Sequence, residues 1–206
     1  MNLKSKSFVI LAFASIGFAA QQATVVSTTD WKLFETKDGK FAIKAPKAWG
    51  KADPNDPSTK DAMEKIKANN PNLAKMVESQ DNQFALYMFD FGGDAAKGLN
   101  NMNLKVLADT GMTSAMYPDV ASAILKQTGM KNSGNKVIDL PAGKALTYWG
   151  DLPVALGEGK SMDFKVYGFM IVKENMTYIC TMTTTPAQDK VEKPIFEAMA
   201  KSIVLK

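Results

Sequence analysis

The side chains that could do chemistry in this sequence are carboxylates, lysines and hydroxyls, because histidine is absent and Cys180 is the one cysteine. Without histidine the chain cannot build a Ser-His-Asp or Cys-His system, and it has no imidazole ligand for zinc or iron. Cys180 alternates with the apolar residues Tyr178 and Met182, and this spacing favours a small buried side chain over a reactive thiol. The sequence therefore excludes the His- and Cys-based classes of catalytic and metal site.

One pattern of carboxylates could bind a metal ion, the segment DPNDPSTKDAME over residues 53–64. Four oxygen-bearing side chains fall at positions 1, 3, 9 and 12 of a calcium loop, namely Asp53, Asn55, Asp61 and Glu64. Pro57 and Ser58, however, stand where the loop requires a ligand and a glycine. The aspartates and prolines also fit helix starts, because aspartate caps helices and proline suits the first turn. We favour the helix starts and expect no metal and no cofactor.

Two further motifs resemble the ends of known sites. GEGKS, residues 157–161, imitates a phosphate-binding loop, but Val154 stands where the pattern needs glycine and a strand follows instead of a helix. Ser133 precedes Lys136 by three residues in a stretch that contains glycine, as a Ser-Lys pair would. We interpret the first motif as a hairpin loop and the second as a turn.

Carboxylates could also support hydrolysis without histidine. The candidates are Asp90 with Asp94, and Asp151. Their spacing does not distinguish them from solvated loop acids, and a function has to be argued from a site. We therefore expect that the protein is not an enzyme.

The N-terminal segment has the pattern of a secretory signal peptide. Lys4 and Lys6 precede an apolar run over residues 8–20, and Gly17 and Ala19 are small residues where a signal peptidase needs them. The run is shorter than the roughly 20 residues of a transmembrane helix. We predict a signal peptide over residues 1–19 with cleavage near Ala19, a flexible lead over 20–30, one domain over 31–206, and a periplasmic or extracellular location.

The charge pattern argues against nucleic acid as a partner. All basic residues are lysines, and loss of the signal peptide leaves 23 of them against 21 acids, a formal charge of +2. The two signs are interleaved, as in KDAMEKIK, which is typical of a solvated surface. Without arginine the chain also lacks the bidentate donor that reads guanine.

The apolar periodicity predicts an α+β fold. The sequence predicts strands over residues 31–36, 40–45, 83–91, 104–108, 136–140, 144–151, 161–173 and 176–184. It also predicts helices from residues 56 and 71, over 118–128, and from 186 with an interruption near Pro194. Residues 161–173 are apolar on both faces, so layers must cover both sides of the sheet. We expect an α/β/α sandwich with a mainly antiparallel sheet of six to eight strands and helices on both faces.

The stretch DGKFAIKAPKAWG, residues 38–50, is the clearest fold signature. Gly39 serves the turn, and Phe41 begins an apolar strand face opposite a face that carries lysines, which predicts a strand near the edge of its sheet. Pro46 ends the strand because it lacks an N–H donor. We expect Trp49 to return over the sheet and close the core.

This stretch, together with NMNLKVL at 101–107, GKALTYWG, FKVYGFMIVKENMTYICTMTTT and PIFEAMAKSIVL, resembles the PsbP-like superfamily. That superfamily includes the extrinsic PsbP protein of photosystem II, a Ran-binding nuclear-import relative and exported bacterial proteins. The resemblance covers about residues 31–205 and implies the fold. It does not carry over the photosynthetic role or metal sites, because the histidines that some members use are absent here.

The resemblance and the missing catalytic pattern lead to three functional hypotheses. The first is an exported, non-enzymatic accessory or adaptor protein that docks on an extracytoplasmic protein or on a membrane complex, with peripheral membrane association through that complex. The second is a carrier of an apolar ligand, since the thirteen methionines could line an adaptable cavity as well as fill the core. The third is the carboxylate-based hydrolase.

Overall fold

The structure is a computed structural model that describes residues 26–52, 84–92, 100–157 and 160–206, together with the helical positions 60, 61, 64 and 68. The predicted signal peptide, most of the flexible lead and the predicted helix from residue 71 lie outside the described residues. So do Asp53, Asn55 and Asp94.

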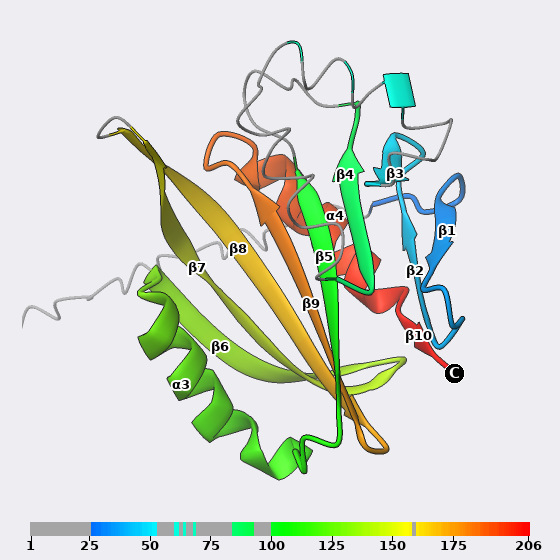
Figure 1. The fold of residues 1–206 in the computed structure, drawn as a ribbon, viewed down its shortest axis with the longest axis vertical. Coiled ribbons are helices and arrows are strands. Elements are labelled where there is room, and N and C mark those ends of the chain that lie inside the picture. The colour runs from blue at the N-terminus through cyan, green and yellow to red at the C-terminus, as the bar shows by residue number, and fades with distance from the viewer. Residues whose placement is uncertain are drawn as a thin grey trace, which may run out of the picture.

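The main element is a seven-stranded antiparallel sheet (Figure 1). Its strands are β3 (Trp49–Lys51), β4 (Leu86–Asp90), β5 (Asn101–Ala108), β6 (Lys131–Leu140), β7 (Gly143–Gly157), β8 (Lys160–Lys173) and β9 (Met176–Thr184). Their order in space is β3-β4-β5-β9-β8-β7-β6. The last four strands form a meander of hairpins, because short turns join each strand to an antiparallel neighbour.

A second, three-stranded sheet was not expected. It contains β1 (Lys32–Glu35), β2 (Phe41–Ala45) and β10 (Val204–Leu205), with β2 in the middle. The prediction that β2 lies near an edge is therefore wrong. The physical reason is a partner from the far end of the chain, since Leu205 pairs with Phe41 and the Lys206 N–H donates to the carbonyl of Lys40 at 2.9 Å.

Two helices pack on opposite faces of the main sheet. The helix α3 (Tyr117–Thr128) follows the 3₁₀ turn η2 (Ser114–Met116) and buries Tyr117 and Ala121 against Leu146 and Met170. The helix α4 (Asp189–Lys201) packs its apolar side on the other face, with Phe196 in the core. Among the described residues, no helix is long and apolar enough to span a membrane.

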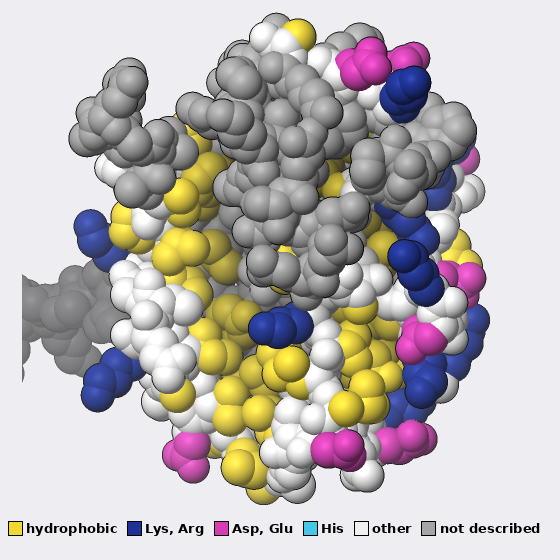
Figure 2. Space-filling model, in the orientation of Figure 1, with side chains coloured by type: hydrophobic (Ala, Val, Ile, Leu, Met, Phe, Trp, Pro, Cys, Tyr) yellow, Lys and Arg dark blue, Asp and Glu magenta, His cyan; other side chains and the backbone are white. Residues whose placement is uncertain are grey.

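The coarse prediction of an α+β fold with a mainly antiparallel sheet is confirmed. Figure 2 shows hydrophobic side chains gathered over the central part of one face, and charged side chains of both signs along the edge beside β1 and β2. The interleaving of charge along the sequence thus persists on this part of the surface.

Several predicted boundaries shift where pairing overrides local composition. β6 begins at Lys131, so the predicted turn around Ser133 is wrong, and the glycine there instead accompanies a register shift between Lys131 and Gly134. β4 lies next to the edge strand β3 and is not central, although Met88 and Phe89 on its two faces are both fully buried. Gly157 pairs with Lys160 across the β7–β8 hairpin, as predicted for this motif, while residues 158 and 159 lie outside the described residues.

The helix α4 also differs from its prediction. It begins at Asp189, three residues after Pro186, and runs through Pro194 without interruption. Proline lacks the N–H that would bond to the preceding turn. Burial of Phe196 and Met199 in the core favours a continuous helix despite this loss.

The fold signature lies where β2 meets the main sheet. Gly39 has φ +68°, a left-handed conformation that glycine adopts without strain, and Phe41 is buried. β2 ends one residue before Pro46. Trp49 is 2% exposed and lies within β3, where its ring meets Phe196 of α4 edge-on at 6.2 Å between centroids.

Candidate functional site

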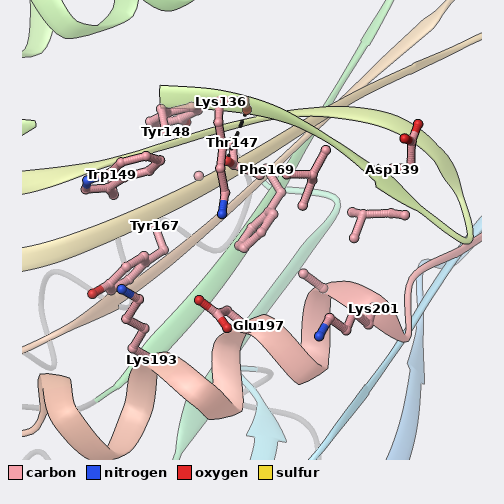
Figure 3. A pocket seen from close by; sticks show the side chains of 14 residues that line it. Lys136, Asp139, Thr147, Tyr148, Trp149, Tyr167, Phe169, Lys193, Glu197 and Lys201 are labelled. Carbon is pink, nitrogen blue, oxygen red and sulfur yellow. Dashed lines mark hydrogen bonds between the residues drawn. The ribbon is translucent and has the colours of Figure 1, made fainter. Parts of the chain in front are cut away.

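A groove of about 370 Å³ lies between α4 and the strands β6, β7 and β8 (Figure 3). Strand residues form one wall and the floor, and they are Lys136, Ile138, Asp139, Leu140, Thr147, Tyr148, Trp149, Tyr167, Gly168 and Phe169. The helix supplies the other wall through Lys193, Glu197, Ala200 and Lys201.

The aromatic floor follows from strand alternation. Trp149 pairs with Tyr167 across β7 and β8, so both rings lie on the face that α4 covers. Gly134 of β6 pairs with Trp149 on its other side, and a Cβ atom at this glycine would lie 2.6 Å from Cζ2 of the indole. The glycine therefore makes room for the Trp149 ring beside β6.

Tyr167 fastens the start of α4 to the sheet. Its hydroxyl donates a hydrogen bond of 2.5 Å to Oδ1 of Asp189, and its ring meets Phe196 edge-on at 5.9 Å. Burial raises the pKa of this hydroxyl, and the bond to Asp189 raises it further. Tyr167 is therefore a neutral hydrogen-bond donor that links the strand β8 to the start of α4.

The groove carries an excess of positive charge. Asp139 is paired with Lys144 at 3.2 Å, which leaves Glu197 as the acid that faces the three lysines Lys136, Lys193 and Lys201. None of these three lysines forms an ion pair with another residue of the described chain. In Figure 3 the Lys136 ammonium reaches into the groove toward α4.

A second polar cluster lies at the start of α4, where Asn100, Thr184 and Glu192 are buried and Asp90 is half-buried. Thr184 donates to Oδ1 of Asn100 at 2.7 Å, and the Asn100 amide donates to Oδ2 of Asp90 at 3.3 Å. Glu192 is 8% exposed and its Oε2 has no hydrogen-bond partner. Burial raises the pKa of Glu192 to about 7, the charge of Asp90 adds to the rise, and a hydrogen bond with Asn100 opposes it.

Asp151 of β7 forms an ion pair with Lys165, its partner on the neighbouring strand β8. Its Oδ1 lies 2.5 Å from Nζ of Lys165, and the Asn132 amide donates to its Oδ2 at 2.8 Å. The hydrogen bond with Lys165, followed by that from Asn132, lowers the pKa of this carboxyl. The spacing of Asp90 and Asp151 did not distinguish them from solvated loop acids; in the structure both belong to strands and both accept hydrogen bonds.

The other predicted residues are not brought together. Asp61 and Glu64 of the calcium pattern are exposed helical positions, and their proposed partners lie outside the described residues. Across the described ranges there is no group of three or more Cys, Asp or Glu side chains that could hold a metal ion. Cys180 is 1% exposed, and burial raises its pKa to about 12, so its thiol is inert as predicted.

The groove itself was missed at the sequence level. Its residues come from segments that are separated by dozens of positions, and its lysines look like an ordinary solvated face. Two signals could have found it: the aromatic residues of β7 and β8 that share one strand face, and the charges of α4 at four-residue spacing.

Comparisons with known proteins identify the fold. No protein-family model matches the sequence, and no curated protein matches it significantly. Among solved structures, the chain is similar to the Ran-binding protein Mog1p of Saccharomyces cerevisiae, with a TM-score of 0.50 and 8% identity over 85% of this chain and 95% of Mog1p.

Two further structures cover most of the chain with lower TM-scores. The cyanobacterial PsbP of Synechocystis sp. PCC 6803 has a TM-score of 0.46 and 10% identity over 88% of this chain and 95% of its own. LpqN of Mycobacterium tuberculosis, involved in cell envelope biogenesis, has a TM-score of 0.48 and 7% identity over 85% of this chain and 90% of its own. The match to Mog1p thus confirms, at the level of the fold, the resemblance predicted from the sequence motifs, and this chain has the Mog1p-like fold.

Proposed function

We propose that the protein is an exported, non-enzymatic accessory protein that docks on a partner protein through the groove between α4 and the β6–β8 face. One observation carries the proposal: an aromatic floor lies beneath three lysines that have no ion-pair partner in the described chain. The few residues that dominate the binding energy of protein interfaces are enriched in Trp and Tyr, and exposed cations steer a partner of opposite charge. The layering that serves this site is an α/β/α sandwich, with α4 as the wall of the groove.

The apolar-carrier hypothesis finds less support. A carrier needs an enclosed apolar cavity, whereas the helix wall of this groove is lined by the exposed side chains of Lys193, Glu197 and Lys201. The buried methionines Met88, Met182 and Met199 pack within the core cluster and do not line the groove. Core filling therefore accounts for these thioethers.

The adaptor role also draws on fold-level analogy. Mog1p shares the fold and is a Ran-binding protein, so a protein-binding surface on this fold has a counterpart. Export stays a proposal that rests on the apolar run over residues 8–20. Association with a membrane would follow from docking on a membrane complex.

Cross-linking with matched variants tests the proposal. Tagged protein, purified after export, is incubated with membrane and soluble extracts of its source organism and cross-linked. The groove variant carries Lys136→Glu, Lys193→Glu and Lys201→Glu, and the control variant carries Lys44→Glu, Lys105→Glu and Lys126→Glu, all exposed positions away from the groove. We expect one reproducible partner that the control retains and the groove variant loses, and equal capture by both variants would contradict the proposal.

A further inference from the structure

The strand β6 ends the main sheet and has a free edge. In the part of the chain that the structure describes, β6 pairs with β7 alone, and no backbone hydrogen bond reaches its outer side. Nine of its ten residues are exposed or half-buried. The strand at the opposite end, β3, has three residues. A long open edge is a template for another strand.

The usable part of this edge borders the groove. β6 is irregular between Lys131 and Gly134, and its regular stretch then runs from Gly134 to Leu140. Seven residues in extended conformation span about 23 Å. The side chains of Lys136, Ile138 and Leu140 line the groove, while Val137 between them is 48% exposed on the other face. A strand added beside β6 would therefore place every second side chain at the mouth of the groove.

The charges of α4 match such a strand in spacing. Lys193, Glu197 and Lys201 follow one another at four-residue intervals along the helix wall (Figure 3). The two lysines are thus about 12 Å apart along the helix axis. Residues four apart in a strand are separated by about 13 Å. Two acids at that spacing, with an uncharged residue between them opposite Glu197, would complement the wall.

We infer that the partner contributes an extended acidic segment, which adds as a strand to the free edge of β6 and places acids four residues apart against Lys193 and Lys201. This inference rests on the proposed docking function and names the chemistry of the partner. The middle residue of the segment lies beside Ile138 of β6, which is half-buried and lines the groove, so an apolar side chain fits there. Binding by strand addition uses backbone hydrogen bonds for affinity and alternate side chains for specificity.

A second copy of this chain does not fit this description. The strand β6 itself carries Lys131 and Lys136 against one acid, Asp139. Pairing β6 with itself would bring further lysines to a groove that already has an excess of them. The occupant is therefore a different polypeptide with a negative charge.

Synthetic peptides test the inference on the purified, exported protein. The probe is the capped octapeptide TETFTETS, whose glutamates are four residues apart with phenylalanine midway. The control TTEFETTS has the same composition but places both glutamates on the opposite strand face. We expect the probe to shift the amide resonances of residues 135–140 and of α4 with a Kd of about 1 mM or tighter, and the control to bind at least fivefold more weakly. No shifts, or equal binding of both peptides, would overturn the inference.

Backbone methylation distinguishes strand addition from simple charge attraction. Alternate N–H groups of an added strand point toward β6 and away from it. One probe peptide is N-methylated at its third and fifth residues and another at its fourth and sixth. We expect one series to lose binding and the other to keep it, because only one set of N–H groups faces β6. Equal loss or equal retention would overturn strand addition.

The inference of strand addition can fail while the docking proposal holds, and the experiments distinguish the two. Lys193→Gln with Lys201→Gln should weaken probe binding about three- to tenfold, as expected for two exposed charge pairs. Unchanged binding would contradict the assigned register. If the peptides fail while the cross-linked partner is still lost with the groove variant, docking stands and the partner presents a surface other than an extended strand.

Discussion

Two clusters of charged side chains lie on the same helix, α4, and differ in their exposure to water. Lys193, Glu197 and Lys201 are exposed along the groove. Glu192, one position before the first of these lysines, is buried beside Asp90 and Asn100. The exposed charges keep their hydration and can meet a partner at little cost, whereas the buried carboxylate loses its hydration and its pKa rises. One helix thus combines the face that we propose binds a partner with a group that couples the stability of the fold to pH.

The largest expected effect on stability comes from removing a core side chain beneath α4. Trp49→Ala removes a 2% exposed indole that packs against Phe196, so it should lower the free energy of unfolding by about 3–5 kcal/mol. Urea denaturation monitored by circular dichroism measures the loss. A cost below about 1 kcal/mol would mean that Trp49 does not hold α4 on the sheet.

A smaller change should perturb the groove side. Gly134→Ala places a methyl group 2.6 Å from Cζ2 of Trp149, so the ring must move, at a cost of about 1–3 kcal/mol. Thermal unfolding gives the cost, and tryptophan fluorescence reports the displaced ring. Gly111→Ala is the matched control for fluorescence, because a Cβ there meets no atom within 4 Å. Its φ of +62° still strains the backbone, so only its emission spectrum should stay unchanged.

The buried cluster predicts a dependence of stability on pH. The pKa of Glu192 is about 7 in the folded chain against 4.5 for an ordinary glutamate, so the folded state binds an extra proton between these pH values. Stability contributed by this group is therefore full below pH 4.5 and is lost as the pH rises through 7. Glu192→Gln should abolish this loss and be more stable than the natural chain at pH 8, by an amount on the order of 1 kcal/mol.

Thermal melts from pH 4 to pH 8 measure this dependence. Glu197→Gln, on the exposed side of the same helix, is the matched control and should leave the pH profile unchanged. Equal pH profiles for Glu192→Gln and the natural chain would show that Glu192 is hydrated in solution.

The smallest effect on stability should come from the exposed lysines. Lys193→Gln removes a charge that has no ion pair in the described chain, so the free energy of unfolding should change by less than about 0.5 kcal/mol. A larger change in the thermal midpoint would mean that Lys193 supports the fold, which would erase the contrast between the two clusters.

The local pattern of the sequence predicted much of the fold. Alternation of apolar residues identified β8 and β9 closely, and α3 ends at Thr128 as predicted, followed by Gly129 with φ +63°. Long-range pairing explains the failures. β2 is a middle strand because residues near the C-terminus join it, and Ser133 lies in a strand because β7 extends beside it.

The candidate sites were harder to predict for the same reason. Asp90 and Glu192 are about a hundred positions apart, and nothing local signals that they share a buried cluster. The lysines of α4 match a solvated surface until the aromatic residues of β7 and β8 are placed opposite them. The types of side chain could be identified from the sequence. Which of them lie next to one another depends on how the strands pair in the sheet.

The pairing of β2 with β10 bears on when the small sheet can form. Ala42 pairs with Val204, so one side of β2 receives its neighbour only when the final residues of the chain are present. A chain that emerges N-terminus first, from a ribosome or through a membrane pore, can form the β1–β2 hairpin early. It cannot complete that sheet until the last turn of α4 has cleared the exit. Closure of so distant a contact is a slow step in folding, so we expect the β2–β10 pairing to form later than the β1–β2 hairpin.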